Sequence, residues 1–102
     1  MKGKITLSDF RRSLADQDPP GGPSAPLVSL WWAAKGEWDK AHAIAQDDDS
    51  ADAAWVHAHL HRVEGDLGNA RYWYARARRA PATGPLKAEW EAIVAALLGS
   101  AN

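Results

Sequence analysis

Apolar side chains recur along this chain at the spacing of one helix face, and polar, glycine-rich or proline-rich stretches separate them. Leu7, Phe10 and Leu14 form such a stripe near the N-terminus, where Thr6 and Asp9 have the spacing of a helix-capping pair. A second stripe near the C-terminus consists of Leu86, Trp90, Ile93, Val94 and Leu97. The pattern predicts an all-α protein whose helices pack through their apolar faces.

The middle of the chain contains an internal repeat. Gly65 lies 29 residues after Gly36, and each glycine follows a charged residue and precedes an acid, a large apolar residue and then an alanine. Each glycine also separates two segments of helical periodicity, where a tight turn needs a residue that tolerates unusual backbone angles. The repeat therefore predicts two helical hairpins.

We expect the 102 residues to form a single domain, which consists of five predicted parts. Four prolines and two glycines exclude a regular helix from residues 17–26 and predict a linker. The open faces of two stacked hairpins need covers at both ends, and we expect Trp90 to anchor one of them. The parts are an N-terminal lid helix (1–16), the linker (17–26), hairpin 1 (27–49), hairpin 2 (50–81) and a C-terminal capping helix (85–99).

The second hairpin resembles a tetratricopeptide repeat (TPR). The resemblance is carried by Gly65-Asp66-Leu67, Ala70, Tyr74, Ala77 and Pro81, and in the first hairpin by Gly36-Glu37-Trp38 and Ala41. Ala45 stands where the family has an aromatic residue, and the period is shorter than the family's. The run from Trp55 to Tyr74 is also similar to small microbial proteins of this type. The resemblance implies a TPR-like stack that binds partners and implies no activity.

Composition narrows the class of protein further. The chain has no cysteine, so it has no disulfide and no thiolate ligand. It has six tryptophans, and we expect these rings to fill much of its interior. Its net charge is -1. Residues 1–10 contain no apolar run long enough for a signal peptide, and no stretch reaches membrane-spanning length. We expect a cytoplasmic protein that does not enter a membrane.

In TPR proteins the first helices of the hairpins form a concave groove. The residues expected there on this chain are Asp52, Trp55, His59 and Arg62. An aromatic plane, an imidazole and a guanidinium could together receive an apolar peptide side chain and a carboxylate. A solvated helix face without a partner is the alternative reading.

Three histidines and an acid are clustered in the same segment. His57, His61 and Glu64 share one helix face and could hold a metal ion. When the two hairpins are aligned by their 29-residue period, His57 corresponds to Val28 and His61 to Trp32, both inward-facing apolar positions. This correspondence favours packing of the two histidines against Tyr74 or Ala70 instead. Metal or small-ligand binding is the alternative function.

Two further chemistries can be weighed from the sequence. Bases alternate with rings in residues 71–79, a combination that can bind single-stranded nucleic acid, but the net charge and the packing position of Tyr74 argue against that partner. The acids of residues 47–49 lack the spacing of a cation-binding loop, and no nucleophile or phosphate-binding motif accompanies them.

The sequence therefore predicts a non-catalytic interaction module that uses no cofactor. Its expected partner is a peptide or protein segment in the groove, or a second copy of the chain held through exposed aromatic residues.

Overall fold

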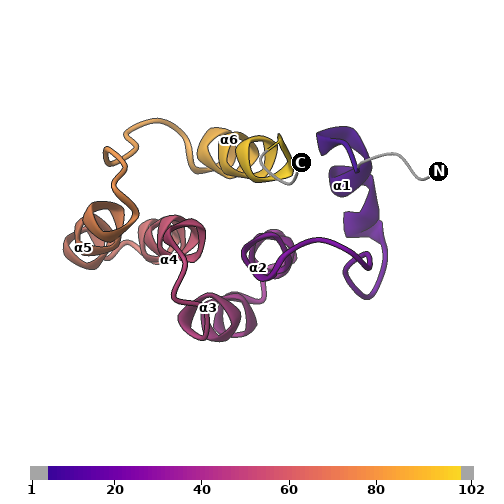
Figure 1. Cartoon of the computed structure of the whole chain (residues 1–102), viewed down its shortest axis with the longest axis horizontal. Coiled ribbons are helices and arrows are strands. Elements are labelled where there is room, and N and C mark those ends of the chain that lie inside the picture. Colours follow the sequence, from indigo (N-terminus) through magenta and orange to yellow (C-terminus); the bar gives the residue numbers. More distant parts are fainter. Residues whose placement is uncertain (1–4, 100–102) are drawn as a thin grey trace.

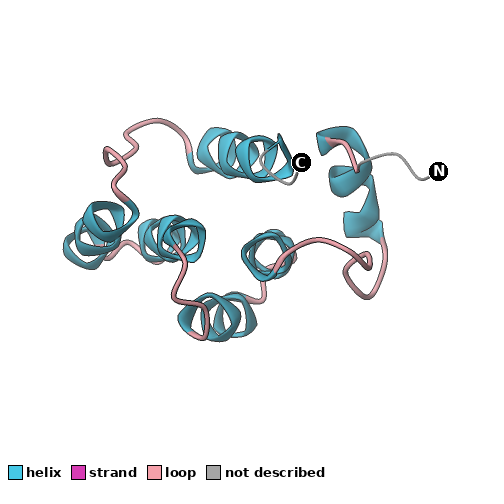
Figure 2. Ribbon diagram, in the orientation of Figure 1, coloured by secondary structure: helices cyan, strands magenta, loops and turns pink. Residues whose placement is uncertain are grey.

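The computed structural model describes residues 5–99, in which every regular element is helical (Figures 1 and 2). The predicted all-α class is confirmed. No helix in this part of the chain is both long enough and apolar enough to cross a membrane. In chain order the elements are α1 (Leu7–Arg12) with the 3-10 turn η1 (Ser13–Ala15), α2 (Ala25–Ala34), α3 (Trp38–Gln46), α4 (Ala51–Val63), α5 (Leu67–Ala77) and α6 (Leu86–Gly99).

Several helix boundaries follow local signals in the sequence. Thr6 and Asp9 form the expected reciprocal cap of α1, with Asp9 N donating to Thr6 Oγ1 over 3.0 Å. The N-terminal helix is shorter than the predicted 1–16, whose first four residues lie outside the described chain. Pro26 belongs to the first turn of α2 and not to the linker, because proline needs no hydrogen-bond acceptor there.

The two repeat glycines make the turns between consecutive helices. Gly36 joins α2 to α3 with φ of 82°, and Gly65 joins α4 to α5 with φ of 85°. A Cβ added at either glycine would meet no atom within 4 Å, so the backbone angle and not crowding requires glycine here. The spacing of these glycines thus sets where each helix pair turns.

The helices pack in pairs and layers around α2 and α4 (Figure 1). Each of these two central helices contacts the helix that follows it, and α3 also packs against α4. The C-terminal helix α6 lies across α2 and α4 on the side opposite α3, and α1 lies beside α6 (Figure 1). The face of α2 and α4 that was expected to form an open groove is therefore partly covered by α6.

Large rings and aliphatic side chains form one main core between α6 and the central helices. Trp90 is 8% exposed, its ring lies 6.0 Å from that of Phe10, and its Nε1 donates to Leu30 O over 2.8 Å. Through these contacts Trp90 attaches α6 to α1 and α2. The buried members of the core are Phe10, Leu27, Leu30, Trp31, Ala41, Ala45, Val56, Leu60, Trp90, Ile93, Val94 and Leu97.

Candidate functional site

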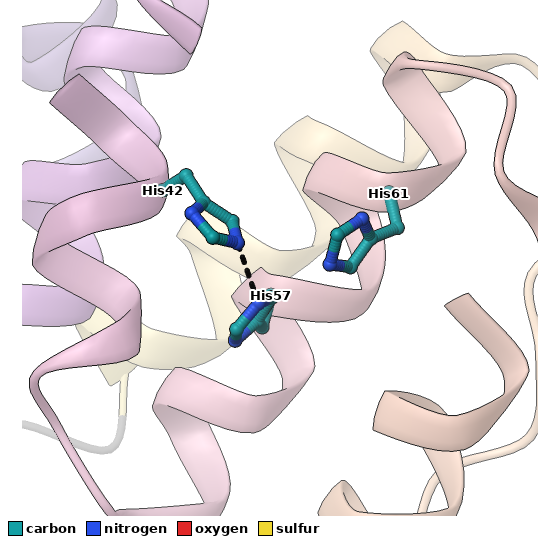
Figure 3. A group of neighbouring side chains, drawn as sticks. All are labelled: His42, His57 and His61. Carbon is teal, nitrogen blue, oxygen red and sulfur yellow. Dashed lines mark hydrogen bonds between the residues drawn. The ribbon is translucent and has the colours of Figure 1, made fainter. Parts of the chain in front are cut away.

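Three of the chain's four histidines meet at the contact between α3 and α4 (Figure 3). His57 and His61 lie four residues apart on α4, and this spacing places both rings on one face of the helix. His42 projects from α3 toward them. We call these three residues the histidine cluster.

The ring nitrogens of the histidine cluster converge. His42 Nε2 and His57 Nε2 lie 2.9 Å apart and share a hydrogen bond, in which one ring donates and the other accepts. One nitrogen from each of the three rings lies within 4.8 Å of the other two. In Figure 3 the ring of His61 points toward the pair that His42 and His57 form. The cluster therefore offers three nitrogen ligands to one small volume.

Two tryptophans enclose the histidine cluster. Trp38 stacks on His42 at a centroid distance of 4.7 Å, and Trp73 stacks on His57 at 3.8 Å. Trp38 is itself held by a 2.7 Å hydrogen bond from its Nε1 to Leu60 O. The repeat register correctly indicated that His57 packs inward, but its stacking partner is Trp73 and not Tyr74 or Ala70.

Glu64 lies beside the histidine cluster without facing its centre. His61 Nδ1 donates to Glu64 Oε1 over 2.5 Å, which leaves His61 Nε2 available on the other side of the ring. His61, Glu64 and Asp66 also form a second group of potential ligands, in which both acids are exposed. A carboxylate bonded to Nδ1 fixes the orientation of a histidine ring and increases the basicity of its other nitrogen. Glu64 is thus better placed to orient His61 than to be the third ligand.

Burial keeps His42 and His57 neutral near pH 7. Burial, together with the neighbouring His42 and His61 rings, lowers the pKa of His57 to about 4. The pKa of His42 is also lowered, first by burial and then by His61. His57 is 3% exposed and His61 6% exposed, whereas His42 is only half-buried. Neutral rings have lone pairs to share, and His42 is the most exposed of the three rings.

The sequence singled out His57, His61 and Glu64 but missed His42. His42 lies 15 residues before His57, on a different helix, so no spacing rule relates them. Only the packing of α3 on α4 places their rings together. The histidine on α3 supplies the third ring to a pair that the sequence could identify.

The stripe predicted to line the groove is mostly covered. Asp52 is exposed, and Trp55 is half-buried beneath the Arg79 guanidinium, which lies 3.7 Å from its ring centroid. His59 is only 2% exposed, and both His59 and Arg62 bond Glu89 of α6. The structure therefore leaves Asp52 and part of Trp55 accessible, while the other two side chains attach α6 to α4.

Glu89 is the centre of a buried polar network. It accepts hydrogen bonds from His59 Nδ1 and Arg62 Nη1, both over 2.8 Å, and from the Tyr74 hydroxyl. Burial by itself would raise the pKa of Glu89, but these three hydrogen bonds outweigh it and hold the pKa below its usual value. Burial and the same carboxylate raise the pKa of Tyr74 above its usual range. Glu89 is therefore an ion with three donors, and it connects α4, α5 and α6.

Two hollows remain on either side of α6. One, of about 420 Å³, lies beside Trp55 and Arg79 and is lined on α6 by Ala88 and Ala92. The other, of about 480 Å³, is lined by side chains from α1, η1, α2, α4 and α6, with His59 among them. We call these the Trp55 hollow and the His59 hollow. The α6 helix thus divides the predicted groove into two separate concavities.

The basic and aromatic segment of α5 is largely engaged within the protein. Trp73 stacks on His57 and Tyr74 is buried against Glu89, so that of the three rings only that of Tyr72 is strongly exposed, at 54%. The Arg76 guanidinium lies over both the Tyr72 and Trp73 rings. One ring therefore remains as a stacking platform.

Comparison of the chain with protein-family models, curated proteins and solved structures found no match.

Proposed function

We propose that this protein binds one divalent transition-metal ion through the imidazole nitrogens of His42, His57 and His61. The convergence of three ring nitrogens within 4.8 Å of one another carries the proposal. Imidazole is a good ligand for zinc, copper, cobalt and nickel, and three histidine ligands with a remaining open position are typical of zinc sites that keep a bound water.

The distances in the histidine cluster fit this chemistry after small movements. A tetrahedral zinc ion with Zn–N bonds of about 2.0 Å holds its nitrogens about 3.3 Å apart. His42 and His57 are closer than that, at 2.9 Å, so their mutual hydrogen bond must open. His61 must approach by up to roughly 1.5 Å, which rotation of its side chain can supply. An ion would then replace the hydrogen bond as the link between α3 and α4.

The neutral state of His42 and His57 also favours metal binding. A histidine must be neutral to coordinate an ion, and the lowered pKa values of His57 and His42 keep both rings neutral near pH 7. Glu64 accepts a hydrogen bond from His61 Nδ1, as the outer partner of a metal-bound histidine commonly does. These features need no change in the fold before an ion arrives.

Packing alone gives a weaker account of three histidines at this position. Burying an imidazole lowers its pKa, and this loss of proton affinity opposes folding wherever the unfolded ring would be charged. Aliphatic or phenyl side chains would fill the space between Trp38 and Trp73 without that penalty. A ligand that needs neutral nitrogens explains why the rings are there.

Calorimetric titration of the metal-free protein with Zn²⁺ tests the proposal directly. We expect one equivalent per chain in wild type and loss of that binding in His42→Ala, His57→Ala and His61→Ala. Co²⁺ provides a second measurement, because its visible absorption reports nitrogen coordination and geometry. Glu64→Gln should weaken affinity by about 10-fold or more, because the ring of His61 loses its charged partner.

His59 offers the matched control because it is the one histidine outside the cluster. Its ring bonds Glu89, and His59→Gln retains a donor for that carboxylate. This variant should bind Zn²⁺ with unchanged stoichiometry and affinity once circular dichroism shows that it is folded. Absence of saturable binding in wild type, or equal affinity in the cluster variants, would reject a metal site.

Binding of a peptide or protein segment is the second candidate function, and the Trp55 hollow favours it. The Arg79 guanidinium stacks on Trp55 and, within residues 5–99, has no ion-pair partner. A cation over an aromatic floor suits a segment that carries an apolar side chain next to a carboxylate. Such binding agrees with the TPR-like stack that the sequence resembles.

Selection from a peptide-display library tests this second function. Peptides enriched on wild type should carry an acid beside an apolar residue and should lose affinity for Trp55→Ala and Arg79→Glu. Exposed Arg71 supplies a control, since Arg71→Glu makes the same charge change on α5 outside the hollow. Enrichment that survives both hollow variants would place the contact elsewhere.

A further inference from the structure

The His59 hollow combines an apolar wall with a free cation. It is lined by Leu14 of η1, Val63 of α4, and Leu86 and Trp90 of α6. Its volume of about 480 Å³ lies within the usual range of small-ligand sites. The hollow lies on the opposite side of α6 from the Trp55 hollow, so it is a separate place on the molecule.

Two exposed apolar side chains flank this hollow from different helices. Val63 at the end of α4 is 44% exposed, and Leu86 at the start of α6 is 38% exposed. Single apolar residues on a surface are ordinary, but a pair on opposite helices at the rim of one concavity can be covered by one ligand. A chain of several methylene groups would remove both from water.

The charges around the hollow favour an anion. Lys87 lines it and has neither an ion pair nor a hydrogen bond among residues 5–99. Arg11 also lines it and is only loosely paired with Glu91, at 3.5 Å between Arg11 Nη1 and Glu91 Oε2. With two cations and one acid, the rim has a net positive charge of one unit. That balance fits a ligand with a single negative charge.

His59 adds a buried polar group to the wall of the hollow. Its Nδ1 donates to Glu89 Oε1 over 2.8 Å, so Nε2 is the polar atom that remains for a ligand. The hydrogen bond to the Glu89 carboxylate fixes the orientation of the ring.

We propose that the His59 hollow binds a small amphiphilic monocarboxylic acid, with its apolar chain against Leu14, Val63 and Leu86 and its carboxylate beside Lys87. A carboxylate pairs with the lysine, and burial of the chain supplies most of the affinity. The site shares no residue with the histidine cluster, so it does not depend on metal binding.

An NMR titration of the metal-free protein with octanoate, kept below its micelle concentration, tests the site. Saturable shifts are expected at the amides of Ala33, Val63 and Leu86 and at the indole of Trp90. Octylammonium has the same chain with the opposite charge and should bind at least fivefold more weakly. Equal affinity for the two amphiphiles, shifts centred on other surfaces, or no saturable binding would each overturn the proposal.

Two variants locate the contacts. Lys87→Glu should weaken octanoate binding at least fivefold, and Val63→Asp should do so by placing a charge against the apolar chain; both side chains are exposed, so folding should survive. Arg71→Glu is the matched control for charge, since it is an exposed residue outside the hollow, and it should change the affinity less than twofold. Unaltered binding by Lys87→Glu would contradict the assignment of the carboxylate.

Discussion

Glu89 Oε1 lies 2.8 Å from His59 Nδ1, and both side chains are buried. The same carboxylate accepts from Arg62 and Tyr74, so it attaches α6 to α4 and α5. The partial closure of the predicted groove therefore depends on the ionised Glu89 carboxylate as well as on the apolar contacts of α6.

Removal of this carboxylate should strongly destabilise the protein. Glu89→Ala removes the acceptor of Arg62 Nη1, His59 Nδ1 and the Tyr74 hydroxyl, and Arg62 keeps its hydrogen bond from Nη2 to Gly84 O. We expect the free energy of unfolding, measured by urea denaturation, to fall by about 3 kcal/mol.

Glu91 is a matched control on the same helix. Its carboxylate is 3.5 Å from Arg11 Nη1 in a pair that solvent reaches. Glu91→Ala should change the free energy of unfolding by no more than about 1 kcal/mol. Similar losses in the two variants would show that the buried network contributes little beyond a surface ion pair.

The stability of the metal-free protein should fall as the pH is lowered from about 6.5 toward 4. The pKa of His57 is about 4 in the folded protein and near 6.5 when unfolded, so the unfolded chain binds more protons across this interval. The lowered pKa of His42 acts in the same direction. The free energy of unfolding should decrease by on the order of 2 to 3 kcal/mol, as measured by urea denaturation at several pH values.

His57→Phe separates this effect from the titration of carboxylates. The phenyl ring can still stack on Trp73 but has no nitrogen to protonate. Its free energy of unfolding should depend less on pH between 6.5 and 4 than that of wild type. Parallel curves for the two proteins would mean that His57 is not the group responsible.

Arg78 has a backbone conformation that favours glycine. It ends α5 with φ of 60° and ψ of 43°, in the left-handed region that a Cβ disfavours. Arg78→Gly should raise the free energy of unfolding by about 0.5 to 1 kcal/mol, measured by thermal or urea denaturation.

Arg71→Gly tests the same substitution inside the helix. Arg71 is exposed within α5, where glycine lowers helix stability, so this variant should lose about 1 kcal/mol. Opposite signs for the two substitutions are the expected result. A loss of stability in Arg78→Gly would show that its side chain makes a contribution larger than the backbone penalty.

Trp90 should be among the most sensitive core positions. Trp90→Ala removes a nearly buried indole together with its hydrogen bond to Leu30 O, and about 3 to 5 kcal/mol of unfolding free energy should be lost. Tyr72→Ala is the comparison, because Tyr72 is exposed and should matter by less than about 1 kcal/mol. An unchanged melting temperature in Trp90→Ala would exclude an anchoring role.

The features that were predictable from the sequence are those that depend on neighbouring residues. The turns at Gly36 and Gly65 follow from local backbone angles, and the cap formed by Thr6 and Asp9 follows from their spacing. The burial of Trp90 follows from the apolar stripe on its own helix. Each of these is encoded within one or two helical turns, so periodicity and residue type are sufficient to find it.

The two sites depend on contacts between helices that are distant in the sequence. Nothing near His57 indicates that His42 will meet it, because that contact requires α3 to pack on α4. The stripe that contains His59 predicted an open groove. In the structure Glu89 covers His59, because α6 folds back across α4. The sequence by itself determined the helices and their apolar faces, whereas packing between distant helices decided which polar groups meet.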